Sequence, residues 1–528
     1  MRSYSRRDLL FTLGATAIAG AASPLDAVVG GVLHTGPVRQ ARTSFVPDVE
    51  LELTAAPARV QILAGAPTEV WRFTGRVASG SSSALEPATG GYLGPTLRLT
   101  RGQKVRIRFI NRLPDPSIVH WHGLDVPQEA DGHPRLAVSS GAEYVYEFTV
   151  VNRAGTYWYH PHPHMQTGPQ VYRGLAGLVI VSDDEEQALG LPDGDADLSW
   201  VLQDRRFDAD NQLVYSLSMM DMETGFLGDR VLVNGRERPS FPLSTRPYRV
   251  RVLNGSNARV YTIAWSDETP MTVIGTDGGL LARPVSRGFV TLAPAQRVEL
   301  WVDLTGRPVG TTLELRSTAF ELADAGPSMG GRGMGMMMGR GRGAGRGAAM
   351  ATTGALPLGA PVSLLTVTVA RAETSAARLP DRLRADRVRR PLTSLPVRRV
   401  PLTFQMMQWQ LDGRVFEMTG VAPEETVAAG STHIWELVNS GGPMGMQMAH
   451  PIHLHGRQFE IVSRSGGSPG NSVRAGLIDE GWHDTVLVLP NETVRVLVTF
   501  SDYRGLFLYH CHILEHEDMG MMRNYRLT

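Results

Sequence analysis

Cys511 is the only cysteine in this chain of 528 residues, and histidines stand on both sides of it. His516 follows five residues after the cysteine and Met521 follows ten residues after it. A thiolate, two imidazoles and a weak axial thioether are the ligands of the trigonal copper sites that transfer electrons. Side chains alternate between the two faces of a strand, so we expect Cys511 to face one metal while His510 and His512 face another.

Histidines recur along the chain in pairs separated by one residue. The pairs are His120/His122, His160/His162, His162/His164, His453/His455 and His510/His512. Random placement of the 15 histidines would give only roughly 0.4 such pairs, so their spacing indicates metal binding. Both rings of a pair point to one face of a strand. Zinc also accepts cysteine and histidine, but a structural zinc site is closed by four ligands, far fewer than this chain supplies.

Four blocks of this sequence resemble the multicopper oxidases, the family of laccases and bacterial cuprous oxidases. The blocks are HWHG from His120, HPH from His160, HPIHLHG from His450 and HCHILEHEDMGMM from His510. Their order and wide separation match the family. The resemblance implies an all-β fold of three cupredoxin-like Greek-key β-sandwich domains. It also implies an enzyme that couples one-electron oxidation of a substrate to four-electron reduction of dioxygen to water.

The resemblance further implies four copper ions per chain, one of type 1, one of type 2 and a type 3 pair. By the family pattern the ligands are His450, Cys511, His516 and axial Met521 for type 1, His120 and His453 for type 2, and His122, His160, His162, His455, His510 and His512 for type 3. Met519 is nearer to Cys511 but lies off the family spacing. Some relatives have lost these ligands and act as copper-free scaffolds, so the complete set argues against that role.

Reduction of dioxygen to water also needs protons at a buried site, and a carboxylate is the obvious carrier. Asp131 lies eleven residues after His120, and Glu517 directly follows His516. Both positions match the proton-relay acids of the family. Taken alone, each residue would be interpreted as a surface or salt-bridged carboxylate.

Methionines suggest which substrate supplies the electrons, because thioethers are soft ligands suited to Cu(I). A Gly-, Arg- and Met-rich segment at 328–350 carries Met329, Met334, Met336, Met337 and Met338, and Met444, Met446 and Met448 precede His450. Met448 matches a methionine of the family's cuprous oxidases, but Met446 stands where they carry an acid. Met219, Met220, Met222, Met406 and Met407 are additional candidates, for which we favour a structural role.

Alternatives to the methionine interpretation remain open. The segment 328–350 is also typical of a flexible loop, and its Arg-Gly run imitates nucleic-acid-binding segments. Methionines before His450 also serve as adaptable core residues. We predict Cu(I) oxidation with a role in copper tolerance; a laccase acting on phenols or aromatic amines is the alternative. A copper-sequestering protein is the alternative of another class.

Composition agrees with an exported protein. The 52 basic and 52 acidic residues give no general attraction to nucleic acid or anionic membrane, and one cysteine excludes an internal disulfide framework. Arg6 and Arg7 precede a short apolar run, which indicates a twin-arginine signal. The run falls short of the ~20 residues that span a bilayer. We therefore expect export to the periplasm by the twin-arginine machinery, no stable membrane insertion, and a monomer.

The elements that must position these residues are strands. Apolar and polar residues alternate in many short runs punctuated by Gly, Pro and Asn, as in β-sandwiches. One pattern occurs three times, at 105–111, 248–254 and 433–439, and each copy ends in Asn, which predicts three similar domains. We expect a signal and leader at 1–45 and domains at 46–185, 196–370 and 395–528. The second domain would carry the insert 328–350, the third the type 1 site, and the trinuclear cluster would lie between the first and third.

Overall fold

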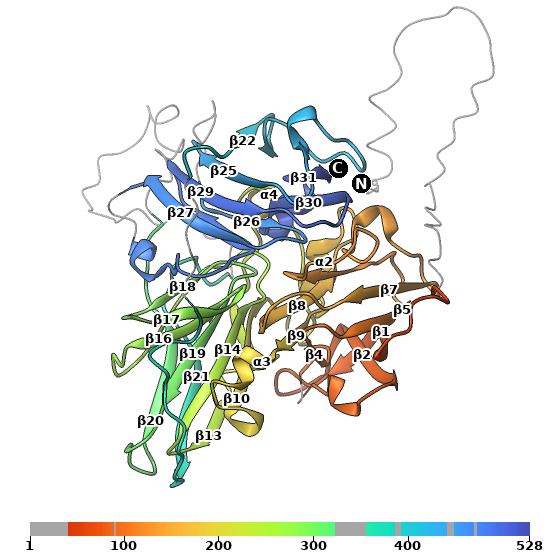
Figure 1. Ribbon diagram of the computed structural model, residues 1–528. Coiled ribbons are helices and arrows are strands. Elements are labelled where there is room, and N and C mark those ends of the chain that lie inside the picture. The colour runs from red at the N-terminus through yellow and green to blue at the C-terminus, as the bar shows by residue number, and fades with distance from the viewer. Residues whose placement is uncertain (1–40, 89–90, 323–354, 386–391, 441–447, 469–471) are drawn as a thin grey trace, which may run out of the picture. The chain divides into compact units, whose positions relative to one another are not determined.

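Strands make up most of the regular structure in the computed structural model, which describes residues 41–88, 91–322, 355–385, 392–440, 448–468 and 472–528 (Figure 1). The predicted all-β class is confirmed. The expected export signal, the segment 328–350, Met444 and Met446 lie outside the described residues. No helix among the described residues has the length and apolar character needed to span a membrane.

The first two sheets contain the strands that precede residue 183. One sheet has the order β2-β1-β5-β7 and the other has the order β3-β4-β9-β8-β6. The strands are β1 (Val49–Val60), β2 (Thr68–Ser79), β3 (Leu85–Glu86), β4 (Thr96–Thr100), β5 (Lys104–Asn111), β6 (Val119–His122), β7 (Glu143–Thr149), β8 (Gly155–Pro161) and β9 (Gly177–Ser182). Residues of both sheets share one hydrophobic core, in which Ile107 and Trp121 are fully buried.

The next two sheets use the strands between residues 197 and 371. Their orders are β12-β11-β10-β14-β19-β16-β17 and β13-β21-β20-β15-β18. The strands are β10 (Asp197–Arg205), β11 (Arg230–Val233), β12 (Arg236–Glu237), β13 (Ser240–Ser244), β14 (Pro247–Asn254), β15 (Tyr261–Trp265), β16 (Met271–Thr276), β17 (Gly279–Arg287), β18 (Val290–Leu292), β19 (Arg297–Asp303), β20 (Thr312–Ser317) and β21 (Val362–Arg371). A second core lies within this pair.

The last two sheets are built from residues 397 to 527. Their orders are β23-β22-β25-β29-β27 and β24-β31-β30-β26-β28. The strands are β22 (Val397–Gln405), β23 (Gln408–Leu411), β24 (Thr426–Val427), β25 (Thr432–Asn439), β26 (His450–Leu454), β27 (Phe459–Gly466), β28 (Thr485–Val488), β29 (Glu492–Thr499), β30 (Gly505–Cys511) and β31 (Met522–Leu527). The third core includes Cys511 and Met521, which are both fully buried.

The few helices among the described residues are short. They are α2 (Thr167–Tyr172), α3 (Asp184–Gln187), α4 (Met219–Thr224) and α5 (Leu514–Asp518), with 3-10 turns at Ser82–Ala84, Pro134–Leu136, Gly194–Ala196, Pro423–Glu425 and Ser472–Gly476. Two of the helices, α4 and α5, contact each other although almost 300 residues separate them. This contact brings α4 to the carboxyl-terminal ligand stretch.

The threefold sequence pattern corresponds to β5, β14 and β25. Each of these strands pairs parallel with one neighbour and antiparallel with another. The terminal residues Asn111, Asn254 and Asn439 are all fully buried, and each amide group donates to two backbone carbonyls. The asparagine amide thus ties the end of the strand to the backbone of neighbouring segments inside the core.

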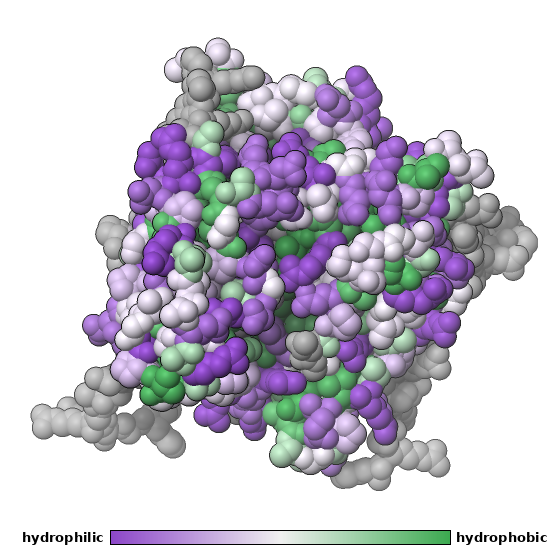
Figure 2. All heavy atoms as spheres, turned by 60° about the horizontal axis from the view of Figure 1, so that its bottom comes forward, coloured by the Kyte–Doolittle hydropathy of each residue, from purple (hydrophilic) through white to green (hydrophobic). Residues whose placement is uncertain are grey.

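Three pairs of sheets thus follow one another along the chain, while Thr35–Thr528 forms one compact unit by its contacts. The proposed domain boundaries stay a prediction. The face drawn in Figure 2 is mostly hydrophilic, with hydrophobic side chains in small separate patches. The apolar side chains of the three cores are buried within the sandwiches.

Candidate metal centres

The first candidate centre is the group of His450, Cys511 and His516. The Cys511 Sγ atom lies 3.6 Å from Nδ1 of His450 and 3.6 Å from Nδ1 of His516. Adjacent strands supply two of these side chains, because β26 pairs with β30 so that Ile452 lies opposite Cys511. His516 comes from α5, which follows β30. One thiol and two imidazoles thus converge on one point, and we call this group the Cys511 cluster.

The Cys511 cluster is fully buried, and burial sets the charge of its members. Burial raises the pKa of the Cys511 thiol well above its usual range and lowers that of His516 to about 3. A neutral imidazole offers a lone pair, and a cation at this point would favour the thiolate. Met521 is also fully buried, and its carbonyl accepts a hydrogen bond from the Cys511 amide at 3.0 Å.

The helix α4, which lies far from Cys511 in the sequence, fixes the orientation of His516. The Nε2–H group of His516 donates to the carbonyl of Glu223 at 2.9 Å, which leaves Nδ1 directed at the sulfur. The indole N–H of Trp409 donates to the same carbonyl at 2.8 Å. The Trp409 ring lies 4.4 Å from the His450 ring and 5.3 Å from the His516 ring between centroids. Sequence reasoning missed both Trp409 and Glu223.

The second candidate centre gathers eight buried histidines, which we call the histidine cluster. They are His120, His122, His160, His162, His453, His455, His510 and His512. In the strand pairing, His120 lies opposite His160 and His453 lies opposite His510. Spacing by two along each of these strands keeps both rings of a pair on the same side.

The donor atoms of the histidine cluster fall into three groups of three, each within 4.8 Å. These groups are His120/His122/His453, His122/His160/His512 and His162/His455/His510. The predicted type 2 ligands therefore share the first group. The six predicted type 3 ligands divide evenly between the other two. The assignment of each copper type stays a prediction.

The ring nitrogens of the histidine cluster are arranged to bind metal ions and not to form hydrogen bonds with one another. His120 Nδ1 donates to the Asp131 carbonyl at 2.6 Å, and His453 Nδ1 donates to the Asp484 carbonyl at 2.7 Å. Their Nε2 atoms then face one another at 3.3 Å with no proton between them. Further buried ring nitrogens have no hydrogen-bond partner, namely His122 Nδ1, His160 Nε2, His162 Nδ1 and both of His512. Burial lowers the pKa of these histidines, so their lone pairs are available to metal ions.

Both predicted proton carriers lie against the histidine cluster. Asp131 accepts a hydrogen bond from His455 Nδ1 at 2.9 Å, and burial raises the pKa of its carboxyl group to about 8. The Glu517 oxygens lie 3.3 Å from His162 Nε2 and 3.2 Å from His510 Nδ1. Burial also raises the pKa of Glu517 well above its ordinary value. Both groups can hold a proton inside a site that water does not reach.

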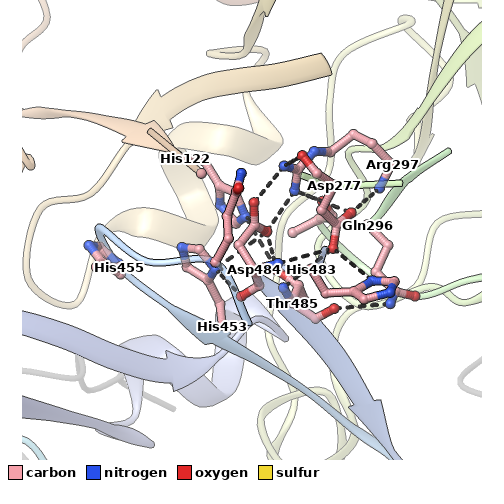
Figure 3. A network of polar contacts seen from close by, with 12 residues as sticks. His122, Asp277, Gln296, Arg297, His453, His455, His483, Asp484 and Thr485 are labelled. Carbon is pink, nitrogen blue, oxygen red and sulfur yellow. Dashed lines mark hydrogen bonds and ion pairs between the residues drawn. The ribbon is translucent and has the colours of Figure 1, made fainter. Parts of the chain in front are cut away.

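Asp484 is a functional residue that the sequence did not reveal. Its carboxylate accepts from His122 Nε2 at 3.0 Å, and its backbone carbonyl accepts from His453, so it orients two cluster histidines (Figure 3). Arg297 donates to both carboxylate oxygens, at 2.7 and 2.5 Å, and is itself fully buried. Asp277 in turn binds the Arg297 amide at 2.7 Å. This network orients metal ligands from behind, and no spacing in the sequence links its members.

The methionines are distributed differently from expectation. Met448 is half-buried and packs on the third core. Four of the other methionines are exposed and do not lie in a hydrophobic core, and their role stays a prediction. Met406 is 88% exposed, Met219 is 66% exposed, Met220 is 51% exposed and Met407 is 44% exposed. They lie on α4, whose Glu223 contacts His516, and on the turn just before β23, whose Trp409 contacts His450 and His516.

Comparisons with known proteins agree with these centres. The family model "Multicopper oxidase" matches residues 76–186 and again 392–528. The multicopper oxidase mco of Staphylococcus haemolyticus is 30% identical over 83% of this chain and 83% of its own length. A laccase of Bacillus stratosphericus is 29% identical over 87% of this chain and 90% of its own.

Among solved structures, a multicopper oxidase of Campylobacter jejuni described as a metallo-oxidase is 25% identical. It covers 90% of this chain and 91% of its own, with a TM-score of 0.71. The similarity therefore extends over both candidate centres.

Proposed function

The chain belongs to the multicopper oxidase family, a family of copper oxidoreductases that use dioxygen, and from this premise we propose that its main reductant is Cu(I). The Cys511 cluster with Met521 would hold the type 1 copper. His120 and His453 would hold the type 2 copper, and the other six histidines of the histidine cluster would hold the type 3 pair. Bound copper would supply the one-electron redox chemistry and the site of dioxygen reduction.

The backbone supplies the path between the two centres. Cys511 belongs to one cluster, and its neighbours in the sequence, His510 and His512, belong to the other. An electron that enters at the Cys511 cluster thus has a short covalent route to the histidine cluster. His510 Nδ1 also donates to the Cys511 carbonyl at 3.0 Å, which fixes one end of this route.

Asp131 and Glu517 would deliver the protons. Each carboxyl group lies against rings of the histidine cluster, and burial favours its protonated form. A protonated acid in this position can donate to a reduced oxygen species without admitting bulk water. After Asp131 or Glu517 has donated its proton, a donor nearer the protein surface would reprotonate it.

The exposed methionines are the observation that supports Cu(I) as the main reductant. Met219 and Met220 begin α4, whose Glu223 carbonyl binds both His516 and Trp409. Met406 and Met407 lie three and two residues, respectively, before Trp409. Soft thioethers on both segments would capture a soft monovalent ion close to the Cys511 cluster.

The conformation of the Met406-Met407 turn supports the same proposal. Both residues have positive φ, 49° and 61°, in the two-residue loop that joins β22 to β23. Such loops prefer Asn-Gly, because a side chain is strained at positive φ. Two exposed methionines at a costly position indicate a function other than packing.

A dioxygen-uptake assay with Cu(I) and with a small phenol tests the proposal. We expect joint replacement of Met219, Met220, Met406 and Met407 by leucine to lower kcat/KM for Cu(I) by about tenfold, which is ~1.4 kcal/mol of transition-state binding. Oxidation of the phenol should change less than twofold, because leucine keeps the apolar bulk. Met271→Leu, at a buried methionine in the second core, is the control and should leave both rates unchanged. Equal losses for both substrates would contradict the proposal.

A laccase acting on phenols or aromatic amines is the second candidate, and the laccase among the relatives supports it. Contacts at the Cys511 cluster favour Cu(I) instead. His450 and His516 are fully buried, and the Glu223 carbonyl occupies Nε2 of His516. A bulky reductant therefore has no direct contact with either ligand. A copper-free scaffold is disfavoured because the whole donor set is present and oriented.

We further propose export by the twin-arginine route and action in the periplasm, where Cu(I) oxidation would serve copper tolerance. The motif at Arg6 and Arg7 supports this proposal. Fusion of residues 1–45 to a reporter tests it, since export should be lost when both arginines become lysine. Export of the lysine variant through the general secretory route would contradict it.

A further inference from the structure

A cavity of about 620 Å³ lies beside Gly123, the residue that follows His122. Four arginines line it, namely Arg101, Arg153, Arg384 and Arg457. They come from four separate stretches of the chain and converge only in the folded protein. The cavity is of a size that holds small ligands.

The lining of this arginine cavity is strongly positive. Among the described residues that line it, one is acidic: Asp125, which forms an ion pair with Arg457. Four guanidinium groups and one carboxylate leave an excess of three positive charges. Neither Arg101 nor Arg384 forms a salt bridge with any residue that the structure describes. Like charges held close together destabilise a fold, so an anion bound among these guanidinium groups would relieve their repulsion.

Two of the guanidinium groups are held in place before any ligand arrives. Arg153 stacks on the Trp482 ring at 4.4 Å from its centroid. Arg457 donates from Nη1 to the carbonyl of Thr499 at 3.1 Å. Fixed orientation lowers the entropy that a ligand would otherwise lose on binding.

Arg384 supplies an unsatisfied donor. Its Nη1 atom is buried and has no hydrogen-bond partner. An unpaired buried donor costs about 1–3 kcal/mol, which an acceptor on a ligand would recover. Burial also lowers the pKa of the Arg384 guanidinium, and the charge of Glu185 offsets only part of this effect.

We propose that the arginine cavity binds a small soluble oxyanion that carries at least two negative charges, of the phosphate or pyrophosphate class. Guanidinium groups bind such oxyanions through paired N–H donors. The site is separate from both metal centres and does not depend on the identity of the reductant. Gly123 forms the wall between them, since a Cβ atom there would lie 2.4 Å from an Asp484 carboxylate oxygen.

Isothermal titration of the copper-loaded protein with pyrophosphate, phosphate and chloride at low ionic strength tests this proposal. Pyrophosphate should bind saturably, phosphate more weakly, and chloride not measurably. Arg384→Gln and Arg101→Gln should each weaken pyrophosphate binding by about tenfold, as expected for one charge-assisted contact. The copper absorption and electron paramagnetic resonance spectra should not change, because the anion does not ligate a metal.

Arg59→Gln is the matched control, since it removes the same charge at an exposed salt bridge with Glu69 on β1 and β2. Its affinity for pyrophosphate should stay within about twofold of wild type. Absence of saturable binding would overturn the proposal. So would an equal loss in the control, or a copper spectrum that changes with the anion. If Arg384→Gln does not fold, the exposed Arg101→Gln variant decides the question by itself.

Discussion

At Cys511, burial opposes the thiolate form that metal binding requires. The thiol is buried beside two imidazoles that burial keeps neutral. Copper loading of the Cys511 cluster should therefore release a proton. A serine at the same position keeps the size of the side chain but lacks the soft sulfur.

We expect Cys511→Ser to abolish the blue thiolate-to-copper absorption and to reduce dioxygen uptake to background. Copper content should fall by one ion per chain, because the histidine cluster is left intact. Absorption spectra, metal analysis and paramagnetic resonance of the remaining copper provide the measurements. A blue Cys511→Ser variant would remove the basis of the assignment.

We expect Asp131 to give the reaction a pH dependence. Burial raises the pKa of its carboxyl group to about 8, and nearby copper would lower that value again. The protonated form is lost as pH rises through this pKa, so dioxygen reduction by the wild type should decline as pH rises towards 8. Asp131→Asn cannot titrate, and we expect kcat about 100-fold lower and independent of pH over this range.

Steady-state rates between pH 5 and about 9 check this expectation. Glu517→Gln should behave similarly, with copper content and reduction of the Cys511 centre nearly unchanged. If either variant loses copper, that carboxylate orients ligands rather than carrying protons.

At the scale of elements, α4 acts as a cover on the Cys511 cluster. The helix is only six residues long and is held by a capping box in which Ser218 and Asp221 bind each other's backbone. Its Glu223 carbonyl then occupies His516 Nε2. A short helix depends strongly on its cap.

Replacing Ser218 and Asp221 by alanine should destabilise α4 by about 1–2 kcal/mol. We expect phenol oxidation to rise severalfold because His516 becomes accessible, and Cu(I) oxidation to fall because the methionines lose their position. Kinetic assays with both reductants measure the two signs. Asp183→Ala, which removes the cap of α3, is the control and should change neither the phenol oxidation rate nor the Cu(I) oxidation rate. Changes of the same sign for both substrates would mean that α4 is not a cover.

At the scale of the whole molecule, a buried ionic network joins the first and second pairs of sheets. Glu299 accepts hydrogen bonds from Thr156 at 2.7 Å, from Arg251 at 2.9 Å and from Arg249 at 2.6 Å. Burial alone would raise the pKa of Glu299, but the two guanidinium groups together lower it to about 2. The carboxylate is thus stabilised in the folded protein.

Because the folded pKa lies below the unfolded value of 4.5, the contribution of Glu299 is complete above that pH and is lost as pH falls towards 2. Glu299→Gln should lower the free energy of unfolding by about 3 kcal/mol at pH 7. The difference from wild type should shrink as the medium is acidified. Urea unfolding at several pH values measures it. Glu69→Gln at an exposed salt bridge should change stability by less than ~1 kcal/mol.

The sequence by itself identified the candidate metal ligands and determined what kind of elements carry them. Strands repeat every two residues, so a spacing of two places both rings of His120/His122 or His510/His512 on one side without further information. The asparagines that end β5, β14 and β25 likewise marked one strand used three times. Both patterns involve residues close together in the sequence, so they can be recognised without knowledge of the fold.

Only the tertiary structure decided what surrounds those ligands. Asp484 meets His122 across 362 residues, and the Glu223 carbonyl meets His516 across 293 residues. The exposure of Met406 and Met407 likewise followed from the turn at which β22 meets β23. Such contacts depend on how sheets and loops pack, and one carboxylate or backbone carbonyl in the sequence resembles any other. The arginine cavity has the same origin, since its charges converge only when distant segments fold together.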